Sequence, residues 1–386
     1  MGSARRLWHT ENLLTARPWS GKIGGMGATF LPGLELAGQF YADVVRPLLG
    51  EQFPGLRYSA ALLGPGSEVL GFDSERSTDH DWGPRLQLLL AAGTPRHEAD
   101  RIGSALDGRL PASFRGYPVR FAPSGEPPRA ARHHVRVAAL DAWLRGQLGF
   151  DPRAGIAALD WLATPTQRLA ELAGGAVFHD GLGELERVRA SLAWYPRDIW
   201  CYLLACQWQR LSQEEPFPGR CAEAGDDLGS VVITARLARD LMRLCLLMDR
   251  RYPPYSKWLG TAFARCASGP AVGPALRAAL AADGWPTREE HLSAALLAAA
   301  TAHNQLGLTA KLPATMRPFW DRPYLVLDSG RFATALHEAI QDPAIRDLPM
   351  AGAVDQFIDS TDALADAAAL RAAVAALLYP GSPSAR

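Results

Sequence analysis

The chain lacks an excess of charge of either sign. Its 386 residues include 40 Lys and Arg and 40 Asp and Glu, so the formal net charge is zero. Proteins that bind long nucleic acid present basic surfaces, and the balance therefore argues against a template-dependent polymerase or an RNA-tailing enzyme. Long apolar runs are also missing, since the longest candidate, 292–302, is well short of the roughly 20 residues that a membrane-spanning helix needs. We therefore expect neither long nucleic acid nor a membrane as a partner.

Paired cysteine motifs are absent as well. The chain has five cysteines without C-x-x-C spacing: Cys201, Cys206, Cys221, Cys245 and Cys266. Four of the five lie within apolar helical patterns. A buried free cysteine behaves as a small apolar side chain, and free thiols persist in reducing compartments. The pattern predicts buried free thiols in a cytoplasmic protein rather than a zinc site or disulfides.

The hydrophobic pattern divides the chain into three parts. Residues 1–25 have no continuous apolar core followed by a small-residue cleavage site, so we expect a flexible leader rather than a signal peptide. Residues 26–150 mix strands and helices, whereas residues 151–386 are almost entirely helical in pattern. The expected strands cover 58–63, 85–91, 117–121 and 134–140, and the expected helices include 34–49, 97–106, 184–192, 199–213, 228–251, 291–305 and 363–378. We predict an α+β protein in which a mixed sheet with flanking helices precedes a large helical bundle.

A dense motif, LGPGSEVLGFDSERSTDHDW, lies between the first two expected strands. A turn of small residues ends in Gly66 and Ser67, and Asp79 and Asp81 precede the next strand. In an extended segment residues i and i+2 point to the same face, so the two aspartates are predicted to share a cation. Mg²⁺ takes such carboxylates together with waters and substrate phosphates, and the N–H groups and hydroxyl of Gly66-Ser67 are suited to a phosphate. The alternative interpretation is an ordinary turn followed by capping aspartates.

This motif resembles the signature of the nucleotidyltransferase superfamily, typified by polymerase beta and the aminoglycoside nucleotidyltransferases. Further blocks resemble a bacterial family known only as a domain of unknown function: GPGSEVLGFD, STDHDWGPR, WYPRDIW, PPYSKWLGTAF, HNQLGL and VDQFIDSTD. The resemblance implies a nucleotidyltransferase-like sheet domain followed by a helical domain. It also implies Mg²⁺-dependent transfer of a nucleoside monophosphate, with ATP as the expected donor, to a hydroxyl group of a small-molecule acceptor.

A cation for the triphosphate is expected from the helical half. The chain has only three lysines, Lys22, Lys257 and Lys311, and Lys257 lies among aromatic residues in RYPPYSKWLGTAF. The paired prolines break the preceding helix and fix Tyr255 and Lys257 near the start of the next one. We therefore assign Tyr255 and Lys257 to nucleotide binding; a solvated lysine at a helix start is the alternative.

A proton acceptor is also expected from the helical half, within the acidic stretch 210–227. We favour Glu215 as this base, because Pro216 and Gly219 place it where a helix ends. The alternative is that these acids are surface residues or helix caps.

One departure from the superfamily pattern concerns its third carboxylate, which usually comes from a later strand. The candidate strand, HHVRVAAL, carries none, and Arg136 stands where an acid is expected. Asp141 could serve only with a shifted register. A guanidinium at that position would weaken a second metal site. The sequence therefore leaves a second hypothesis open, a catalytically inactive nucleotide-binding or scaffold relative of the same fold.

Overall fold

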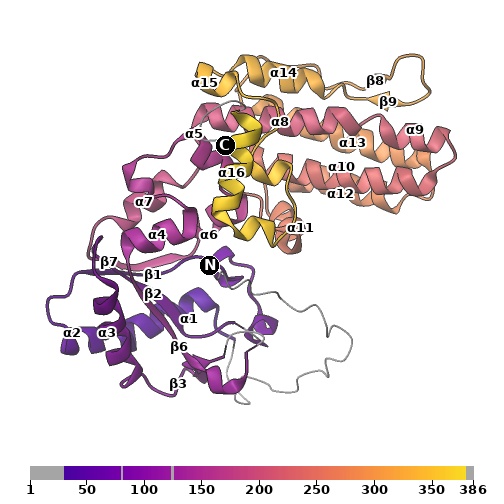
Figure 1. Ribbon diagram of the computed structural model, residues 1–386. Helices are drawn as coiled ribbons and strands as arrows, with labels where there is room; N and C mark the ends of the chain where they lie inside the picture. The colour runs from indigo at the N-terminus through magenta and orange to yellow at the C-terminus, as the bar shows by residue number, and fades with distance from the viewer. Residues whose placement is uncertain (1–29, 80, 123–125, 380–386) are drawn as a thin grey trace, which may run out of the picture.

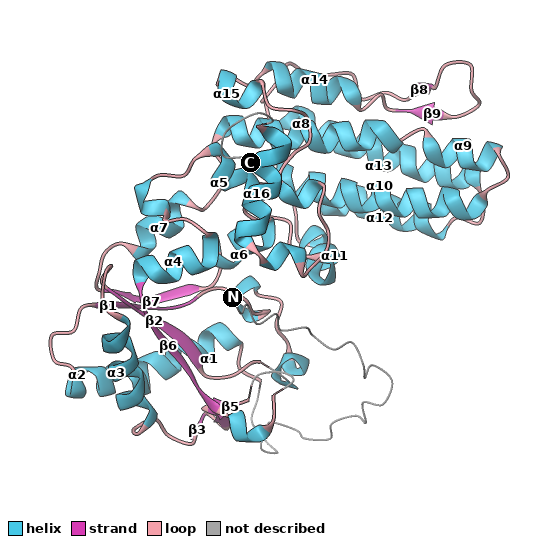
Figure 2. Ribbon diagram, in the orientation of Figure 1, coloured by secondary structure: helices cyan, strands magenta, loops and turns pink. Residues whose placement is uncertain are grey.

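The chain folds into two lobes that meet along one side (Figure 1). The structure is a computed structural model, and it describes residues 30–79, 81–122 and 126–379. The predicted leader, residues 1–25, lies outside this part. A sheet lobe holds most of the first half of the chain, and a helical lobe holds most of the second half (Figure 2). In the described ranges no helix is both long and apolar enough to cross a membrane.

A mixed sheet of five strands forms the centre of the first lobe, as the sequence predicts. The spatial order is β5-β6-β2-β1-β7, where β2 and β6 run parallel and the other neighbours run antiparallel. Its strands are β1 (Tyr58–Leu62), β2 (Arg85–Leu90), β5 (Arg120–Phe121), β6 (Arg132–Ala139) and β7 (Ala176–Asp180). The expected strand 117–121 is divided, because β4 (Tyr117–Pro118) pairs instead with β3 (Ser113–Phe114).

Strand β7 was not predicted. It lies in the segment that the sequence pattern assigns to helices, after residue 150, yet it pairs with β1 along one edge of the sheet. None of its residues is fully buried, and its sequence, AVFHD, does not show the regular alternation of apolar and polar residues that indicates a strand. The helical half of the chain therefore completes the sheet.

Apolar side chains alternate between the two faces of the sheet. Leu86, Leu88 and Leu90 pack on one face against α1 (Gly33–Phe40), α2 (Arg46–Gln52) and α3 (Arg96–Asp107). Leu89 packs on the other face against α4 (Leu140–Leu148), which lies between the sheet and the helical lobe in Figure 1. The second face of the sheet therefore faces the helical lobe.

Long helices lying side by side form the second lobe (Figure 1). The most extensive are α8 (Arg197–Glu214), α10 (Asp227–Met248), α12 (Gly269–Ala281) and α13 (Trp285–Gln305), and all but α12 correspond to predicted segments. The shorter elements are α5 (Ala158–Ala163), α6 (Thr166–Ala173), α7 (Leu185–Ser191), α9 (Phe217–Glu223), α11 (Ser256–Ala264), β8 (Arg317–Pro318), β9 (Leu325–Val326), α14 (Gly330–Glu338), α15 (Pro343–Arg346) and α16 (Ala367–Leu378).

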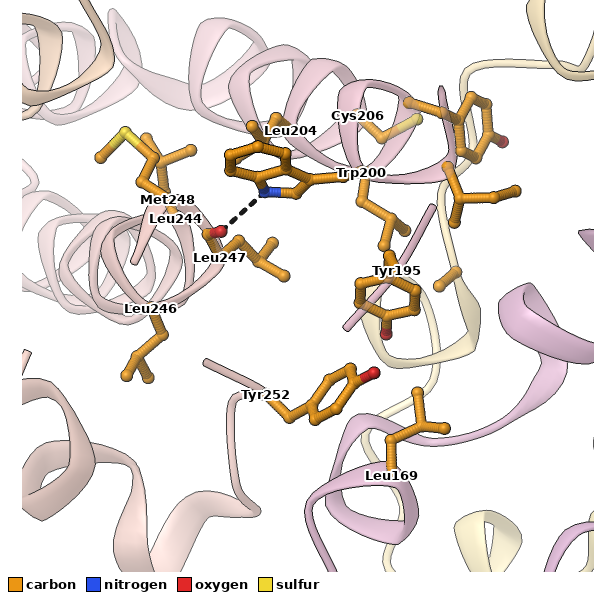
Figure 3. Close-up of a cluster of buried hydrophobic side chains, with 14 of the residues drawn as sticks. Leu169, Tyr195, Trp200, Leu204, Cys206, Leu244, Leu246, Leu247, Met248 and Tyr252 are labelled. Atoms are coloured by element: carbon orange, nitrogen blue, oxygen red, sulfur yellow. Dashed lines mark hydrogen bonds between the residues drawn. The ribbon is translucent and has the colours of Figure 1, made fainter. Parts of the chain in front are cut away.

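A cluster of buried apolar and aromatic side chains joins these helices (Figure 3). Trp200 on α8 is buried, and its indole N–H donates a hydrogen bond of 2.7 Å to the carbonyl of Leu247 on α10. Tyr195 and Tyr252 pack edge to face with ring centroids 5.1 Å apart, and Leu169 of α6 belongs to the same core. The WYPRDIW block is therefore a packing element rather than part of a site.

The cysteines are free, and all except the half-buried Cys221 are buried. Burial raises the pKa of Cys206 to about 12 and that of Cys245 to about 12. Because the thiolate is the reactive form, these side chains act as apolar packing groups, as the sequence predicts.

Replacing Trp200 with Phe should lower the free energy of unfolding by about 1–3 kcal/mol, since apolar contacts and one buried hydrogen bond are lost. The matched control is Trp320→Phe, because Trp320 is 84% exposed and its replacement should cost about 0.5 kcal/mol or less. Guanidinium unfolding followed by circular dichroism measures both. Equal destabilisation by the two substitutions would contradict the packing role of Trp200.

Candidate functional site

A cleft of about 620 Å³ lies between the two lobes. The sheet lobe lines it with Gly66, Ser67 and Asp81, and the helical lobe lines it with Tyr255 and Lys257. These five residues come from separate parts of the sequence, and the structure brings them to one place. The cleft is therefore the candidate site.

The Gly-Pro-Gly-Ser turn follows β1 and is held by Arg85. The Arg85 guanidinium donates to the carbonyl of Pro65 at 2.7 Å and to the carboxylate of Glu68 at 2.7 and 2.5 Å. Gly66 has φ +150°, and a Cβ at this position would collide with the same guanidinium. Both the backbone conformation and the lack of space require glycine here.

The turn presents backbone donors that have no partner. In the described part of the chain, the N–H groups of Gly66, Ser67 and Glu68 donate no hydrogen bond, and neither does the Ser67 hydroxyl. The next three N–H groups, by contrast, bond back to the carbonyls of residues 66–68 in the 3₁₀ turn Glu68–Leu70. Successive free N–H groups of this kind form a concave site for an oxyanion.

The predicted extended geometry of the two aspartates is wrong. Asp79 ends a 3₁₀ turn, Glu75–Asp79, and Asp81 adopts φ +49°, whereas β2 begins only at Arg85. The i, i+2 argument therefore does not apply, because it requires strand backbone. Asp81 still lines the cleft and is exposed to it. The side chain of Asp79 and residue His80 lie outside the described part of the structure.

The candidate strand for a third carboxylate presents other groups. Arg136 on β6 pairs in register with Gln87 on β2, and Gln87 bonds to both the N–H and the carbonyl of Leu63. The alternative residue, Asp141, accepts from Gly93 N–H and Arg145 at the start of α4, and it does not line the cleft. Among the described residues, no three His, Cys, Asp or Glu side chains gather in a metal-binding group.

The described residues fit a Mg²⁺ ion that arrives with a phosphate ligand better than one held in a preformed cage. Mg²⁺ commonly binds through one or two carboxylates and completes its shell with waters and phosphate oxygens. Asp81 provides one such carboxylate in the lining of the cleft that the turn also lines. The arrangement suits an ion shared between protein and ligand.

On the helical side, the start of α11 is fastened to the sheet lobe. Pro253 and Pro254 separate α10 from α11, and the N–H of Tyr255 donates to the side chain of Gln167 at 3.1 Å. The Trp258 ring stacks on Phe72 with centroids 5.2 Å apart. The exposed Lys257 ammonium lies 5.0 Å from the Trp258 ring centre, and no described carboxylate lies within ion-pair distance of it. Its charge is available to a ligand.

Sequence reasoning missed two residues of α6, Arg168 and Glu171, which also line the cleft. The Glu171 carbonyl accepts the N–H of Gly64 at 3.0 Å, and its carboxylate accepts from Gln167 and Arg168. Burial raises the pKa of the Glu171 carboxyl above its usual value. No motif marks α6, because only its tertiary docking brings it to the turn.

Glu215 lies away from the cleft, which corrects its assignment as a base. Its carboxylate is 6% exposed and accepts hydrogen bonds from Leu327 N–H, Ser329 N–H and the Ser329 hydroxyl at 2.9–3.1 Å. Burial raises its pKa to about 7. The side chain fastens the segment before α14 to the end of α8, so its role is structural.

Residues 161–259 match a family model described as a domain of unknown function (DUF4037). The matched stretch contains much of the helical wall of the cleft, including Arg168, Glu171 and Lys257, but not the Gly-Ser turn. No curated protein and no solved structure matches the chain. The match agrees with the resemblance to a family of unknown function, and the description of that family names no activity.

Replacing Glu215 with Gln removes a titrating group whose pKa is about 7 in the fold, against an ordinary value of 4.5. A raised carboxyl pKa means that the folded state holds the proton more tightly, so the wild type should lose stability relative to the variant as pH rises from 4.5 to 7. Thermal unfolding across this range measures the difference. If the unfolding temperatures of the two proteins changed in parallel with pH, the raised pKa of Glu215 would be contradicted.

Proposed function

We propose that this protein is a nucleotidyltransferase-like enzyme. It binds a nucleoside triphosphate with Mg²⁺ and transfers the nucleoside monophosphate to a hydroxyl of a small-molecule acceptor. The observation that carries the proposal is the convergence of Gly66, Ser67, Asp81, Tyr255 and Lys257 on one cleft. Backbone N–H groups and an ammonium that have no hydrogen-bond or ion-pair partner among the described residues, together with a carboxylate, are the groups that a metal–triphosphate needs.

Both lobes contribute polar groups to this task. The described residues of the sheet lobe give the cleft Asp81 and the free N–H groups of the turn. The helical lobe gives it Lys257, which pairs with no described carboxylate and would neutralise phosphate oxygens, and Arg168, which pairs with Glu171 at 3.0 Å. Asp81, together with Asp79 as the sequence implies, would hold Mg²⁺, which when bound offsets charge on the phosphates.

Transfer exchanges one P–O bond for another. The acceptor hydroxyl oxygen forms a bond to the α-phosphorus, the bond from that phosphorus to the bridging oxygen of the β-phosphate breaks, and pyrophosphate leaves. The hydroxyl proton passes to a carboxylate. Glu171 replaces Glu215 as the candidate, because it comes from the helical half and lies at the cleft. Its raised pKa favours holding a proton.

The size and charge of the cleft favour small ligands. A volume of about 620 Å³ falls within the range of small-molecule sites. Its described lining has as many basic as acidic side chains: Arg76, Arg168, Arg239, Arg243 and Lys257 against Glu68, Asp81, Glu171, Asp355 and Asp359. A groove for long nucleic acid would instead be strongly basic.

A second candidate is a nucleotide-binding relative that does not catalyse transfer. The observation that favours it is the pairing of Arg136 with Gln87 where the superfamily usually provides a third carboxylate. Both candidates require Mg²⁺-dependent nucleotide binding. They differ only in whether pyrophosphate is released.

Calorimetric titration of ATP and the other nucleoside triphosphates, with and without Mg²⁺, tests the binding step. Lys257→Ala should weaken Mg·ATP binding at least tenfold, or about 1.4 kcal/mol, because a phosphate loses its cation. Lys311→Ala is the matched control, since Lys311 is also exposed and does not line the cleft. Asp81→Ala should abolish the dependence on Mg²⁺. Binding that ignores both the metal and these cleft substitutions would refute the proposal.

Release of pyrophosphate, measured with a panel of hydroxyl-bearing small molecules, tests the transfer step. Glu171→Gln should reduce the rate at least a hundredfold, because it removes the proton acceptor, while Mg·ATP affinity stays within about threefold. A wild type that binds Mg·ATP but releases no pyrophosphate with any acceptor would favour the second candidate. A Glu171→Gln variant with full activity would exclude Glu171 as the base.

A further inference from the structure

A second cavity of about 230 Å³ adjoins the cleft beside α10. Four arginines line it, and two of them, Arg239 and Arg243, also line the main cleft. Asp355 and Asp359 are shared in the same way. The smaller cavity therefore continues the site along the helical lobe, away from the Gly-Ser turn of the sheet lobe.

The four arginines differ in how fully they are paired. Arg210 and Arg236, which line only the smaller cavity of these two, form ion pairs with Asp240 at 3.3 Å and with Glu214 at 2.5 Å. Arg239 pairs at 3.2 Å with Asp359, whose side chain is 72% exposed. An ion pair with a solvated partner of this kind contributes little, so the Arg239 guanidinium can exchange Asp359 for a ligand.

Arg243 has the least compensation of the four. Within the described residues no carboxylate oxygen lies within 4.0 Å of its nitrogens, and it donates to the backbone carbonyl of Asp355. Its Nε is buried without a hydrogen-bond partner. Burial lowers the pKa of Arg243. The Asp355 carboxylate opposes this shift by electrostatic attraction, but it also accepts the N–H of Thr166 at 2.7 Å.

A partly buried guanidinium with an unused N–H donor destabilises the fold unless an anion accepts a hydrogen bond from that donor and balances the charge. The triphosphate has other cationic and N–H partners in Lys257, Arg168 and the Gly-Ser turn. The smaller cavity is too small for a nucleotide but large enough for a charged substituent. The remaining ligand of the site is the acceptor.

We propose that Arg239 and Arg243 bind an oxyanion, a carboxylate or a phosphate, carried by the acceptor. The acceptor is then an anionic small molecule that bears a free hydroxyl. This assignment rests on the proposed function, because it takes the nucleotide to occupy the main cleft. The anion site itself is defined by the arginines alone.

Inorganic phosphate is the probe that tests this subsite. It is titrated into the full-length wild type, Arg239→Gln and Arg243→Gln, each with and without a saturating non-hydrolysable ATP analogue and Mg²⁺. Both variants should bind phosphate at least tenfold more weakly, with the affinity for the analogue unchanged. The matched control is Arg322→Gln, an exposed arginine paired with Glu223 at 3.0 Å outside both cavities. It should behave as wild type.

The outcomes separate the subsite from the nucleotide site. Phosphate binding that depends on Arg239, in a protein that fails to bind the analogue, supports the anion site and overturns the nucleotidyltransferase proposal. Equal loss of phosphate and analogue binding would assign the arginines to the triphosphate and overturn the acceptor assignment. The acceptor assignment is also overturned if the wild type binds no phosphate or if the variants bind it as well as the wild type. If Arg243→Gln does not fold, Arg239→Gln carries the test, because its partner Asp359 is exposed.

Discussion

The cleft depends on how helix α6 is attached to both lobes. At one end, Thr166 donates its N–H to the Asp355 carboxylate and its hydroxyl to the carbonyl of Pro253. Further along, the carbonyl of Glu171 receives the N–H of Gly64. Leu169 meanwhile packs into the aromatic core of the helical lobe (Figure 3). Because buried polar groups must be paired, these bonds fix the turn, α6 and the segment around Asp355 relative to one another.

The second constraint is the ion pair between Arg85 and Glu68. Glu68 is only 3% exposed, so forming this pair carries a desolvation cost. Its structural use is to hold a turn with two glycines at positive φ, Gly64 and Gly66, in a single conformation. The free N–H groups of the turn are therefore preorganised, and a ligand need not order them on binding.

Each lobe supplies part of the lining of the cleft, and neither lobe alone holds all of these groups. The sheet lobe has the donors of a short turn and an exposed carboxylate, while the arginines of α10 and the lysine at the start of α11 belong to the helical lobe. Arg210 and Arg236 each form an ion pair with a carboxylate, Asp240 and Glu214 respectively. Arg239 and Arg243 line both the main cleft and the smaller cavity, and their positive charges are less fully balanced by carboxylates. Arg239 and Arg243 are therefore more available to a ligand than Arg210 and Arg236, which line only the smaller of the two.

The sequence by itself determined the local elements. Apolar runs specify β1 and β2, the glycines specify the turn between β1 and the 3₁₀ segment, and two prolines specify the break before α11. These signals suffice because backbone preference and side-chain periodicity act over a few residues. They also singled out Gly66, Ser67, Tyr255 and Lys257, whereas the selection of Asp81 assumes strand backbone that the structure does not have. They did not show that these residues meet.

Only the tertiary structure decided the remaining features. It placed β7 in the sheet, buried Glu215 against Ser329, gave Asp81 a left-handed backbone and brought Glu171 to the turn. Helix α10 repeats arginine at 236, 239 and 243, yet only Arg239 and Arg243 face the cleft. For β7, Glu215, the Glu171 carbonyl and the arginines of α10, the partner lies more than twenty residues away along the chain, and no local pattern encodes that contact.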